Sequence, residues 1–176
     1  MRSFLSLGLV LAGIAFAAAD TPTKGVRGDI LAWIEDAEKK ITGLAEAIPA
    51  EKYSWRPSEG VRSVGEVFVH VATGNLGIPR MVGIDPPMKM EQGMEKSVTE
   101  KAQVVELLKK SFAHLKDVIG RIQDSDLDKA TKMFGRESTY RNVLMLLVAH
   151  NHEHLGQSIA YARSNGITPP WSMQGE

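Results

Sequence analysis

The sequence predicts an all-α protein that folds as a single four-helix bundle. Four stretches of about 20 residues place apolar side chains at every third or fourth position, which is the spacing of one helix face. Segments that contain Gly and Pro separate these stretches and predict the helix ends. The chain of 176 residues has the length of one domain, and no internal repeat divides it. Amphipathic helices of this number and length are typical of a four-helix bundle.

Residues 1–19 predict a signal peptide, which leaves residues 20–176 as a single bundle domain. Arg2 supplies a positive charge, residues 4–17 form an apolar run, and residues 17–19 are the small alanines that a signal peptidase requires. The run is shorter than the roughly 20 residues that cross a bilayer, so a retained N-terminal anchor is the weaker alternative. We therefore expect an exported protein, periplasmic or secreted, with no membrane contact after the leader is removed.

Two helices are expected in the first half of the chain. The first covers residues 29–48 and ends at Pro49, after which a Pro- and Gly-containing loop follows. The second begins at Ser63, which forms a capping-box pattern with Glu66. Within it, Gly74 would allow another segment to approach closely. The inward apolar positions are Ile30, Ile34, Ala37, Ile41, Leu44 and Ile48 in the first helix, and Val64, Val67, Val71 and Ile78 in the second.

A long connection over residues 83–93 leads to the third helix and is a candidate lid or substrate-facing loop. Ser97 and Glu100 repeat the capping-box pattern and predict that a helix covers residues 101–122. Its inward positions are Val104, Leu108, Phe112, Leu115, Val118 and Ile122. The polar segment 124–136 predicts a loop.

The fourth helix is expected to begin near Ser138 or Thr139 and to end near Asn165, with Gly166 as the residue that closes it. It carries two apolar stripes. They are Val143, Leu147, His150, His154 and Tyr161, and Leu144, Val148, Leu155, Ile159 and Ala162. A helix that is apolar on two sides is either the most buried one or contacts a partner chain as well as the core. This predicts a homodimer through the fourth helix.

The amino-acid composition limits the kinds of partner and of metal ligand that we expect. Lys plus Arg equals Asp plus Glu at 21 each, so the formal net charge is zero. A neutral chain gives no reason to expect a nucleic acid or an anionic membrane as a partner. The chain contains no cysteine. Any metal ion must therefore be held by histidine and carboxylate side chains.

Three histidines form a candidate metal site. His150 and His154 are four residues apart and lie one turn apart on the same face of a helix. His70 lies on the inward face of the second helix. Three neutral imidazoles with an open fourth position are a common ligand set for a catalytic or substrate-binding metal, and a proton-sharing histidine cluster is the alternative. His152 lies about 200° around the helix from His150, so we expect a structural or interface role, and we expect His114 at the surface or rim.

Two further residues near these histidines are candidates for the chemistry. Glu153 stands in the pattern His150-x-x-Glu153-His154, which fits an inverted zinc peptidase motif in which the glutamate activates water. Coincidence is the favoured explanation, because a helical bundle offers no sheet edge for a peptide strand. Gln157 lies about one turn after His154 and is a candidate for orienting a bound ligand, with a plain packing contact as the alternative.

The chain resembles the DinB/YfiT-like superfamily of metalloenzymes. Two stretches carry the resemblance, and they are Ile48–Pro57 leading through Gly60–Glu66 to His70-Val71-Ala72, and His150-x-x-x-His154-Leu155-Gly156-Gln157 leading through Tyr161–Ile167 to Pro169-Pro170. The resemblance implies a four-helix bundle with up-down-down-up topology and one divalent metal ion, often nickel or zinc. The ligand positions carry over onto His70, His150 and His154. Homodimers are common among such proteins, and those with known reactions include thiol-dependent transferases and isomerases.

Two departures weaken the transferase reading. Members often carry arginine after the last histidine, where this chain has Leu155. A signal peptide is also unusual for enzymes of cytosolic thiols, because reduced thiols are scarce outside the cytoplasm.

The functional expectation is a divalent-metal-dependent hydrolase or transferase that acts on a small molecule outside the cytoplasm. A bundle that binds a metal ion or a small molecule without turnover is the alternative. A zinc peptidase that uses Glu153 ranks lower, as does a stable bundle with a degenerate site.

Overall fold

The computed structural model describes residues 24–173. The predicted signal peptide lies outside the described residues. Four long helices form a bundle, and they are α1 (Gly25–Ala47), α2 (Val64–Gly77), α4 (Lys101–Arg121) and α5 (Tyr140–Ser164). The shorter elements are η1 (Ala50–Lys52), η2 (Ile78–Val82), α3 (Met94–Ser97), η3 (Asp124–Asp126), β1 (Ala130–Met133), β2 (Arg136–Thr139) and η4 (Pro170–Met173). None of the helices within these residues has both the length and the apolar character needed to cross a bilayer.

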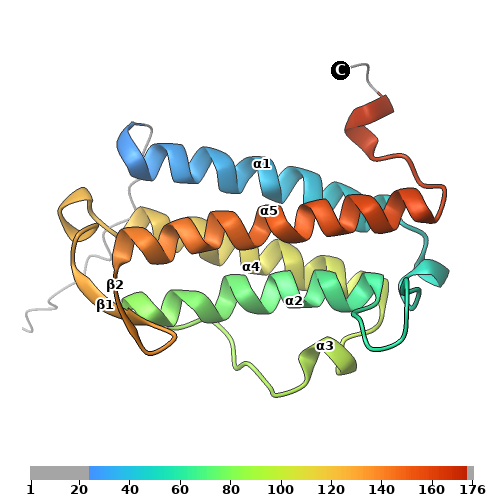
Figure 1. Cartoon of the computed structure of the whole chain (residues 1–176), viewed down its shortest axis with the longest axis horizontal. Coiled ribbons are helices and arrows are strands. Elements are labelled where there is room, and N and C mark those ends of the chain that lie inside the picture. The colour runs from blue at the N-terminus through green and yellow to red at the C-terminus, as the bar shows by residue number, and fades with distance from the viewer. Residues whose placement is uncertain (1–23, 174–176) are drawn as a thin grey trace, which may run out of the picture.

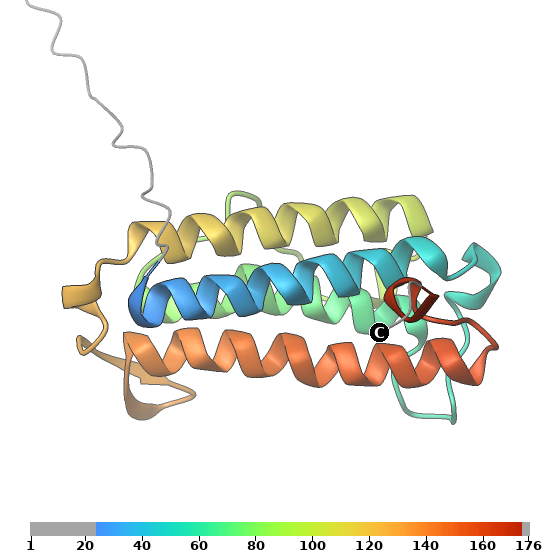
Figure 2. The same cartoon turned by 90° about the horizontal axis from the view of Figure 1, so that it is seen from above.

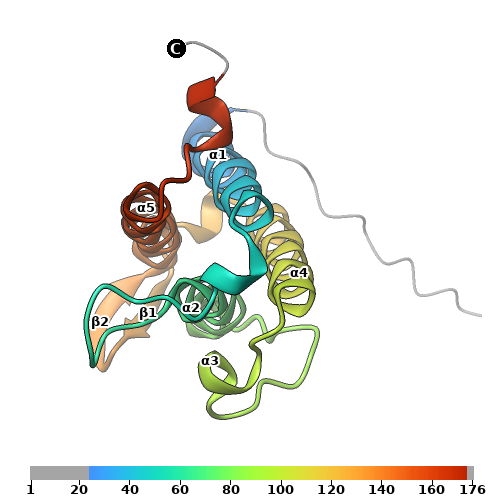
Figure 3. The same cartoon turned by 90° about the vertical axis from the view of Figure 1, so that its right-hand side faces the viewer.

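The four long helices run up, down, down and up in chain order. Figure 1 shows α1 and α5 running in one direction and α2 and α4 in the other. Each of α1 and α2 packs against both α4 and α5, and α1 lies between α4 and α5 when the bundle is viewed from above (Figure 2). The end-on view in Figure 3 shows the same four-cornered arrangement. The predicted all-α four-helix bundle and its topology are confirmed.

The core is made by the apolar faces that the sequence predicts. The largest fully buried side chains are Phe68, Phe112, Ile34, Ile41, Leu44, Ile48, Leu76, Leu108, Leu115, Ile119, Leu144 and Leu147. Burial of one such side chain stabilises the fold by about 1.5–3 kcal/mol. This continuous core gives α2 and α5, which carry the histidines, a fixed position relative to each other.

Helix α1 begins four residues earlier than predicted because of Arg27. The sequence places Arg27 in a polar lead, but its side chain is buried. It donates from Nε to Asp124 at 2.7 Å and from Nη1 to the carbonyl oxygen of Ile122 at 2.6 Å. Arg27 therefore satisfies a carbonyl at the end of α4 and holds the first turn of α1 against it.

The first of the two predicted capping boxes is present, and the second is not. The Ser63 hydroxyl accepts from the Glu66 amide, and the Glu66 carboxylate accepts from the Ser63 amide. By contrast, α4 begins after Glu100 without a side-chain cap. Ser97 cannot cap α4, because it is the last residue of α3 and its amide donates to the carbonyl of Gly93. The pattern was misread because a separate short helix ends where the cap was expected.

The polar segment 124–136 is a loop only in part, because it contains a turn of 3-10 helix and most of a β-hairpin. Strands β1 and β2 pair antiparallel and leave a two-residue turn of Phe134 and Gly135. Both turn residues have positive φ, 50° for Phe134 and 79° for Gly135. Such turns usually carry Asn-Gly or Asp-Gly. A phenylalanine in the first position hid the hairpin from a reading of the sequence.

Helix α5 follows the hairpin directly and has the predicted ends. The Thr139 hydroxyl accepts from the Asn142 amide and caps the first turn. Gly166 closes the other end with φ of +74°, the left-handed conformation expected of a residue that ends a helix. The hairpin also contacts η2, where the Thr131 hydroxyl donates to the carbonyl of Met81.

Candidate metal centre

His70 from α2 and His150 and His154 from α5 come together inside the bundle. One ring nitrogen from each lies within 4.8 Å of the others. The ring centroids are 5.1 Å apart for His70 and His150, and 4.7 Å apart for each of the other two pairs. The helical spacing of four residues brings His150 and His154 to one face, as predicted. The packing of α2 against α5 brings His70 opposite them.

Hydrogen bonds to the outer nitrogens orient two of the three rings. Nδ1 of His70 lies 2.7 Å from Oε1 of Glu95, and Nδ1 of His154 lies 2.8 Å from Oε1 of Gln157. An ionised carboxylate and an amide oxygen only accept hydrogen bonds, so both Nδ1 atoms must carry the proton. The Nε2 atoms of His70 and His154 are therefore left as lone-pair donors that face the cluster.

The outer nitrogen of His150 has no hydrogen bond within the part of the chain that the structure describes, and this side of the ring is held by shape. Its imidazole lies against the backbone of Gly74, and its Nδ1 is buried with no hydrogen-bond partner among the described residues. Its Nε2 lies 3.3 Å from Nε2 of His70. Burial, together with the neighbouring His154 and His70, lowers the pKa of His150 to about 4. The ring is thus neutral at neutral pH, which is the form in which an imidazole binds a metal ion.

The spacing of His70 and His150 fits two ligands of a tetrahedral divalent ion. Two nitrogens that each lie about 2.0–2.1 Å from zinc at the tetrahedral angle are about 3.3 Å apart. This matches the 3.3 Å between the Nε2 atoms of His70 and His150. The same distance also allows a hydrogen bond from Nε2–H of a neutral His150 to the lone pair on Nε2 of His70, which is the proton-sharing alternative. Three imidazoles and no thiolate suit zinc, nickel or copper better than magnesium or calcium.

A second layer of side chains connects these hydrogen bonds. Arg62 donates from Nε to Oε2 of Glu95 at 2.7 Å. Gln157 donates to the hydroxyl of Tyr161 at 3.0 Å, and that hydroxyl donates to the carbonyl of Arg62 at 3.3 Å. Glu95 is ionised, because hydrogen bonds from Arg62 and His70 lower its pKa although burial raises it. The loop that contains Arg62 thereby links the supports of His70 and His154.

The other sequence candidates lie elsewhere. Glu153 is exposed, and it makes no hydrogen bond or ion pair to any of the three histidines. His152 donates from Nδ1 to the carbonyl of Val148 at 2.9 Å and packs edge-on against Trp33, which fits the expected structural role. His114 is buried with 6% exposure, so its expected place at the surface or rim was wrong. It sits on the inner side of α4, one residue before the core residue Leu115.

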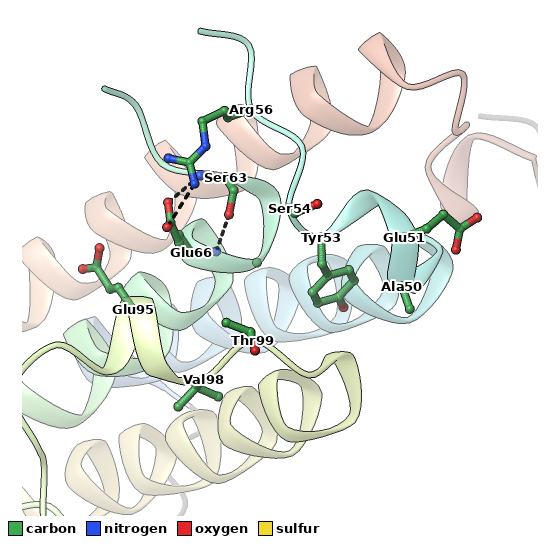
Figure 4. Close-up of a pocket in the computed structure, with 11 residues that line it drawn as sticks. Ala50, Glu51, Tyr53, Ser54, Arg56, Ser63, Glu66, Glu95, Val98 and Thr99 are labelled. Atoms are coloured by element: carbon green, nitrogen blue, oxygen red, sulfur yellow. Dashed lines mark hydrogen bonds and ion pairs between the residues drawn. The ribbon is translucent and has the colours of Figure 1, made fainter. Parts of the chain in front are cut away.

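Two hollows lie near the site and share Arg56, Glu66 and Glu95 in their walls. Figure 4 shows the smaller one, of about 240 Å³, with Glu66 between Ser63 and Arg56 and with Glu95 on the neighbouring α3. The larger one, of about 530 Å³, is lined by Arg56, Arg62, Glu66, Glu95, Lys96 and Gln157. Both residues that orient the histidines, Glu95 and Gln157, therefore also form a wall of this larger hollow.

Reading the sequence missed Glu95 and Arg62. Glu95 lies in a segment without a helical period, 25 residues after His70, and nothing local marks it as a partner. Arg62 lies next to the Ser63 cap in a loop. Its position before a capping box is a usable signal, because the cap fixes the direction in which the chain enters the helix.

Fold and site together define a four-helix bundle with a three-histidine candidate metal centre. The chain belongs to the DinB family, whose sequence profile matches residues 21–174. It is similar to the uncharacterized protein YjoA of Bacillus subtilis strain 168, with 27% identity over 126 residues, which cover 71% of this chain and 81% of that protein.

Solved structures show the same fold. A DinB-like protein from Bacillus cereus ATCC 10987 has a TM-score of 0.71 at 22% identity and covers 80% of this chain and 93% of its own. The crystal structure of YjoA has a TM-score of 0.64 at 24% identity, with coverage of 80% and 93%. A conserved protein from Enterococcus faecalis has a TM-score of 0.66 at 16% identity, with coverage of 80% and 96%.

Proposed function

We propose that the protein binds one divalent metal ion, zinc or nickel, through His70, His150 and His154. The observation that carries this proposal is the convergence of three imidazole nitrogens within 4.8 Å. Two of these rings are held by acceptors at Nδ1, which leaves Nε2 free for the ion. Three protein ligands leave a fourth position for water or substrate.

We further propose that the site serves a hydrolase or transferase reaction on a small molecule outside the cytoplasm. When bound, a divalent ion would lower the pKa of a coordinated water or thiol, or polarise a carbonyl group. The chain's own contribution is positional. Glu95 holds His70, Gln157 holds His154, and the larger hollow, of about 530 Å³, is large enough for a small substrate.

A carrier without turnover is the second candidate. It is favoured by the engagement of Glu95, whose carboxylate accepts from both His70 and Arg62. Glu153, the other carboxylate considered, is exposed. Neither is therefore a free general base at the histidines, and this also argues against the peptidase reading.

Elemental analysis of untagged protein purified from its native compartment tests the metal proposal. The expected result is one zinc or nickel ion per chain, and less than a tenth of an ion would contradict it. Turnover of ester and thioether substrates by the metal-loaded protein then separates enzyme from carrier. The His70→Ala variant is the control, because activity that survives in it does not come from this site.

Export and dimerisation are further proposals. Amino-terminal sequencing of the native protein is expected to find a chain that begins near Asp20, and an intact Met1 would contradict export. The dimer proposed through Val148, Leu155 and Ile159 needs those residues to face a partner. Leu155 is only 5% exposed, so Val148 and Ile159, which are partly buried, would provide most of the contact. Light scattering that finds only monomer at every accessible concentration would exclude it.

A further inference from the structure

The larger hollow beside the histidines has an excess of positive charge. Its charged lining consists of Arg56, Arg62 and Lys96 against Glu66 and Glu95. Three cations thus face two carboxylates, in a chain whose formal net charge is zero. The excess is local, and a ligand that enters this hollow meets one unbalanced positive charge before any metal ion is counted.

Several donor groups of these cations are unused. The Arg62 side chain donates from Nε and Nη2 to Glu95, and within residues 24–173 its Nη1 donates to nothing. Lys96 donates to Glu66 at 2.6 Å, and its side chain is 71% exposed. Arg56 is more fully used, because it bonds both the carbonyl of Val61 and Glu66. Arg62 and Lys96 are therefore the cations with capacity for another acceptor.

The guanidinium group of Arg62 already binds one carboxylate. Glu95 places both of its carboxylate oxygens on the guanidinium, at 2.7 Å and 3.4 Å. A planar guanidinium matches a planar carboxylate, and such charge-assisted pairs are about twice as strong as neutral hydrogen bonds. A second carboxylate at the remaining Nη1 edge, with Lys96 nearby, would balance the excess charge.

The hollow also lies beside the candidate metal ligands. Glu95 and Gln157 belong to its wall and, from the same side chains, bind His70 and His154. A molecule anchored in the hollow is thus one side chain away from the histidines. Its volume of about 530 Å³ is within the range of roughly 300–1,000 Å³ for small-molecule pockets.

We propose that this hollow is the anchoring site for the carboxylate of a small-molecule substrate, with Arg62 and Lys96 as the pairing cations. The proposal rests on the proposed function for its link to the reaction, and it names the chemical class of the substrate. Arg62 acts here by binding the carboxylate and is not one of the proposed metal ligands.

Isothermal titration of the full mature chain with succinate tests the proposal, using metal-free and zinc-loaded protein. Succinamide, which has a similar shape and no charge, is the matched ligand control. We expect succinate to bind both forms of the protein, to weaken as salt is added, and to bind at least about tenfold more tightly than succinamide.

Variants identify the residues. Arg62→Gln is expected to weaken succinate binding at least about tenfold, and Arg62→Lys, which keeps the charge without the fork, to weaken it less. Arg141→Gln is the matched control, because Arg141 also pairs one carboxylate at 2.7 Å and is 47% exposed against 41% for Arg62. It should bind succinate as the parent does. Thermal unfolding of each variant confirms that it is folded.

The results separate this proposal from the metal proposal. Arg62-dependent binding of succinate by protein that takes up no metal would uphold the anchoring site and contradict the metal site. Binding that needs zinc and is unchanged in Arg62→Gln would overturn the anchoring site, because the metal ion itself would then bind the carboxylate. Equal binding of succinamide, tighter binding of inorganic phosphate, or no binding of succinate at all would also overturn it.

Discussion

The imidazole of His150 lies against the bare backbone of Gly74, so closely that a Cβ atom at residue 74 would be 2.4 Å from Cε1 of the ring. Real Cβ contacts are not this short. The ring has no hydrogen bond at Nδ1 within the described residues, so this contact fixes its position together with the contact between its Nε2 and Nε2 of His70. The lack of a side chain at Gly74 on α2 thereby determines where the imidazole of His150 on α5 can lie.

Replacing Gly74 with Ala is expected to displace His150 and weaken metal binding. Overpacking costs about 1–3 kcal/mol, which corresponds to roughly a 5- to 150-fold loss of affinity. The higher helix propensity of alanine, worth about 1 kcal/mol, offsets part of any loss of stability. Zinc titration of the variant measures the affinity.

Gly156→Ala is the control for this substitution. A Cβ atom at Gly156 would meet nothing within 4 Å, although the residue lies in the same helix as two of the histidines. It should bind zinc like the parent and be as stable or slightly more stable. Equal zinc affinity in the Gly74 and Gly156 variants would refute the role assigned to the contact.

Alanine at His70, His150 or His154 is expected to abolish stoichiometric metal binding, whereas alanine at His152 is expected to retain it. The first three converge. His152 instead contacts Trp33 and the carbonyl of Val148, so its loss should lower stability by about 1 kcal/mol. Elemental analysis after dialysis measures the metal. A His152 variant without metal, beside a His70 variant that keeps it, would reverse the assignment.

Glu95→Gln is expected to weaken metal affinity by about ten- to a hundredfold. The substitution keeps the shape of the side chain but removes the charge that fixes the proton on Nδ1 of His70, and such outer partners typically have effects of this size. Glu91→Gln is the control, since Glu91 lies on the same connection and its side chain is 73% exposed. Competition with a coloured chelator compares the two. Identical affinities would show that His70 needs no carboxylate.

The metal-free protein is expected to lose stability as the pH falls from about 6.5 toward 4. Burial lowers the pKa of His150 from 6.5 to about 4, so in this range the unfolded chain binds a proton that the folded chain refuses. The contribution of the neutral His150 to the free energy of unfolding is fully present above pH 6.5 and is lost progressively as the pH falls toward 4. Its size is of the order of 2 kcal/mol after allowance for the solvent that reaches the ring.

Urea unfolding at several pH values measures this effect. His150→Gln removes the ring and should therefore show a shallower fall in stability than the parent over the same range. Other acidic groups titrate equally in both proteins, so the difference isolates His150. Curves that stay parallel down to pH 4 would show that the ring is not protected from protonation.

Helical spacing predicted most of the fold because each long helix has at least one continuous apolar face. It also placed His70, His150 and His154 correctly, since periodicity alone decides which side of a helix faces the core. It failed for His114, where the boundary between core and rim depends on a neighbouring helix. It failed again at Phe134, whose positive φ no pattern of apolar residues reveals.

The supports of the histidines could not be predicted in the same way. Glu95 reaches His70 only because the chain crosses from one end of the bundle to the other between two helices that run in the same direction. Arg62 reaches Glu95 from a loop. Contacts of this kind are fixed by the path of the chain in space, and a single sequence has no local period that records it.

That crossing has a consequence for how such a protein can change. Parallel neighbours α2 and α4 oblige the chain to travel back along the bundle, and Figure 1 shows the connection with α3 passing beside α2 on its way. The helices that carry the three histidines are packed into the core along their length, whereas the crossing enters the core at only some of its residues, among them Ile84 and Met94. Substitutions there, at Glu95 or Lys96, alter the surroundings of the three histidines without unpacking a helix. If the proposed function holds, new substrate preferences can therefore arise in the connection while the candidate metal ligands stay where they are.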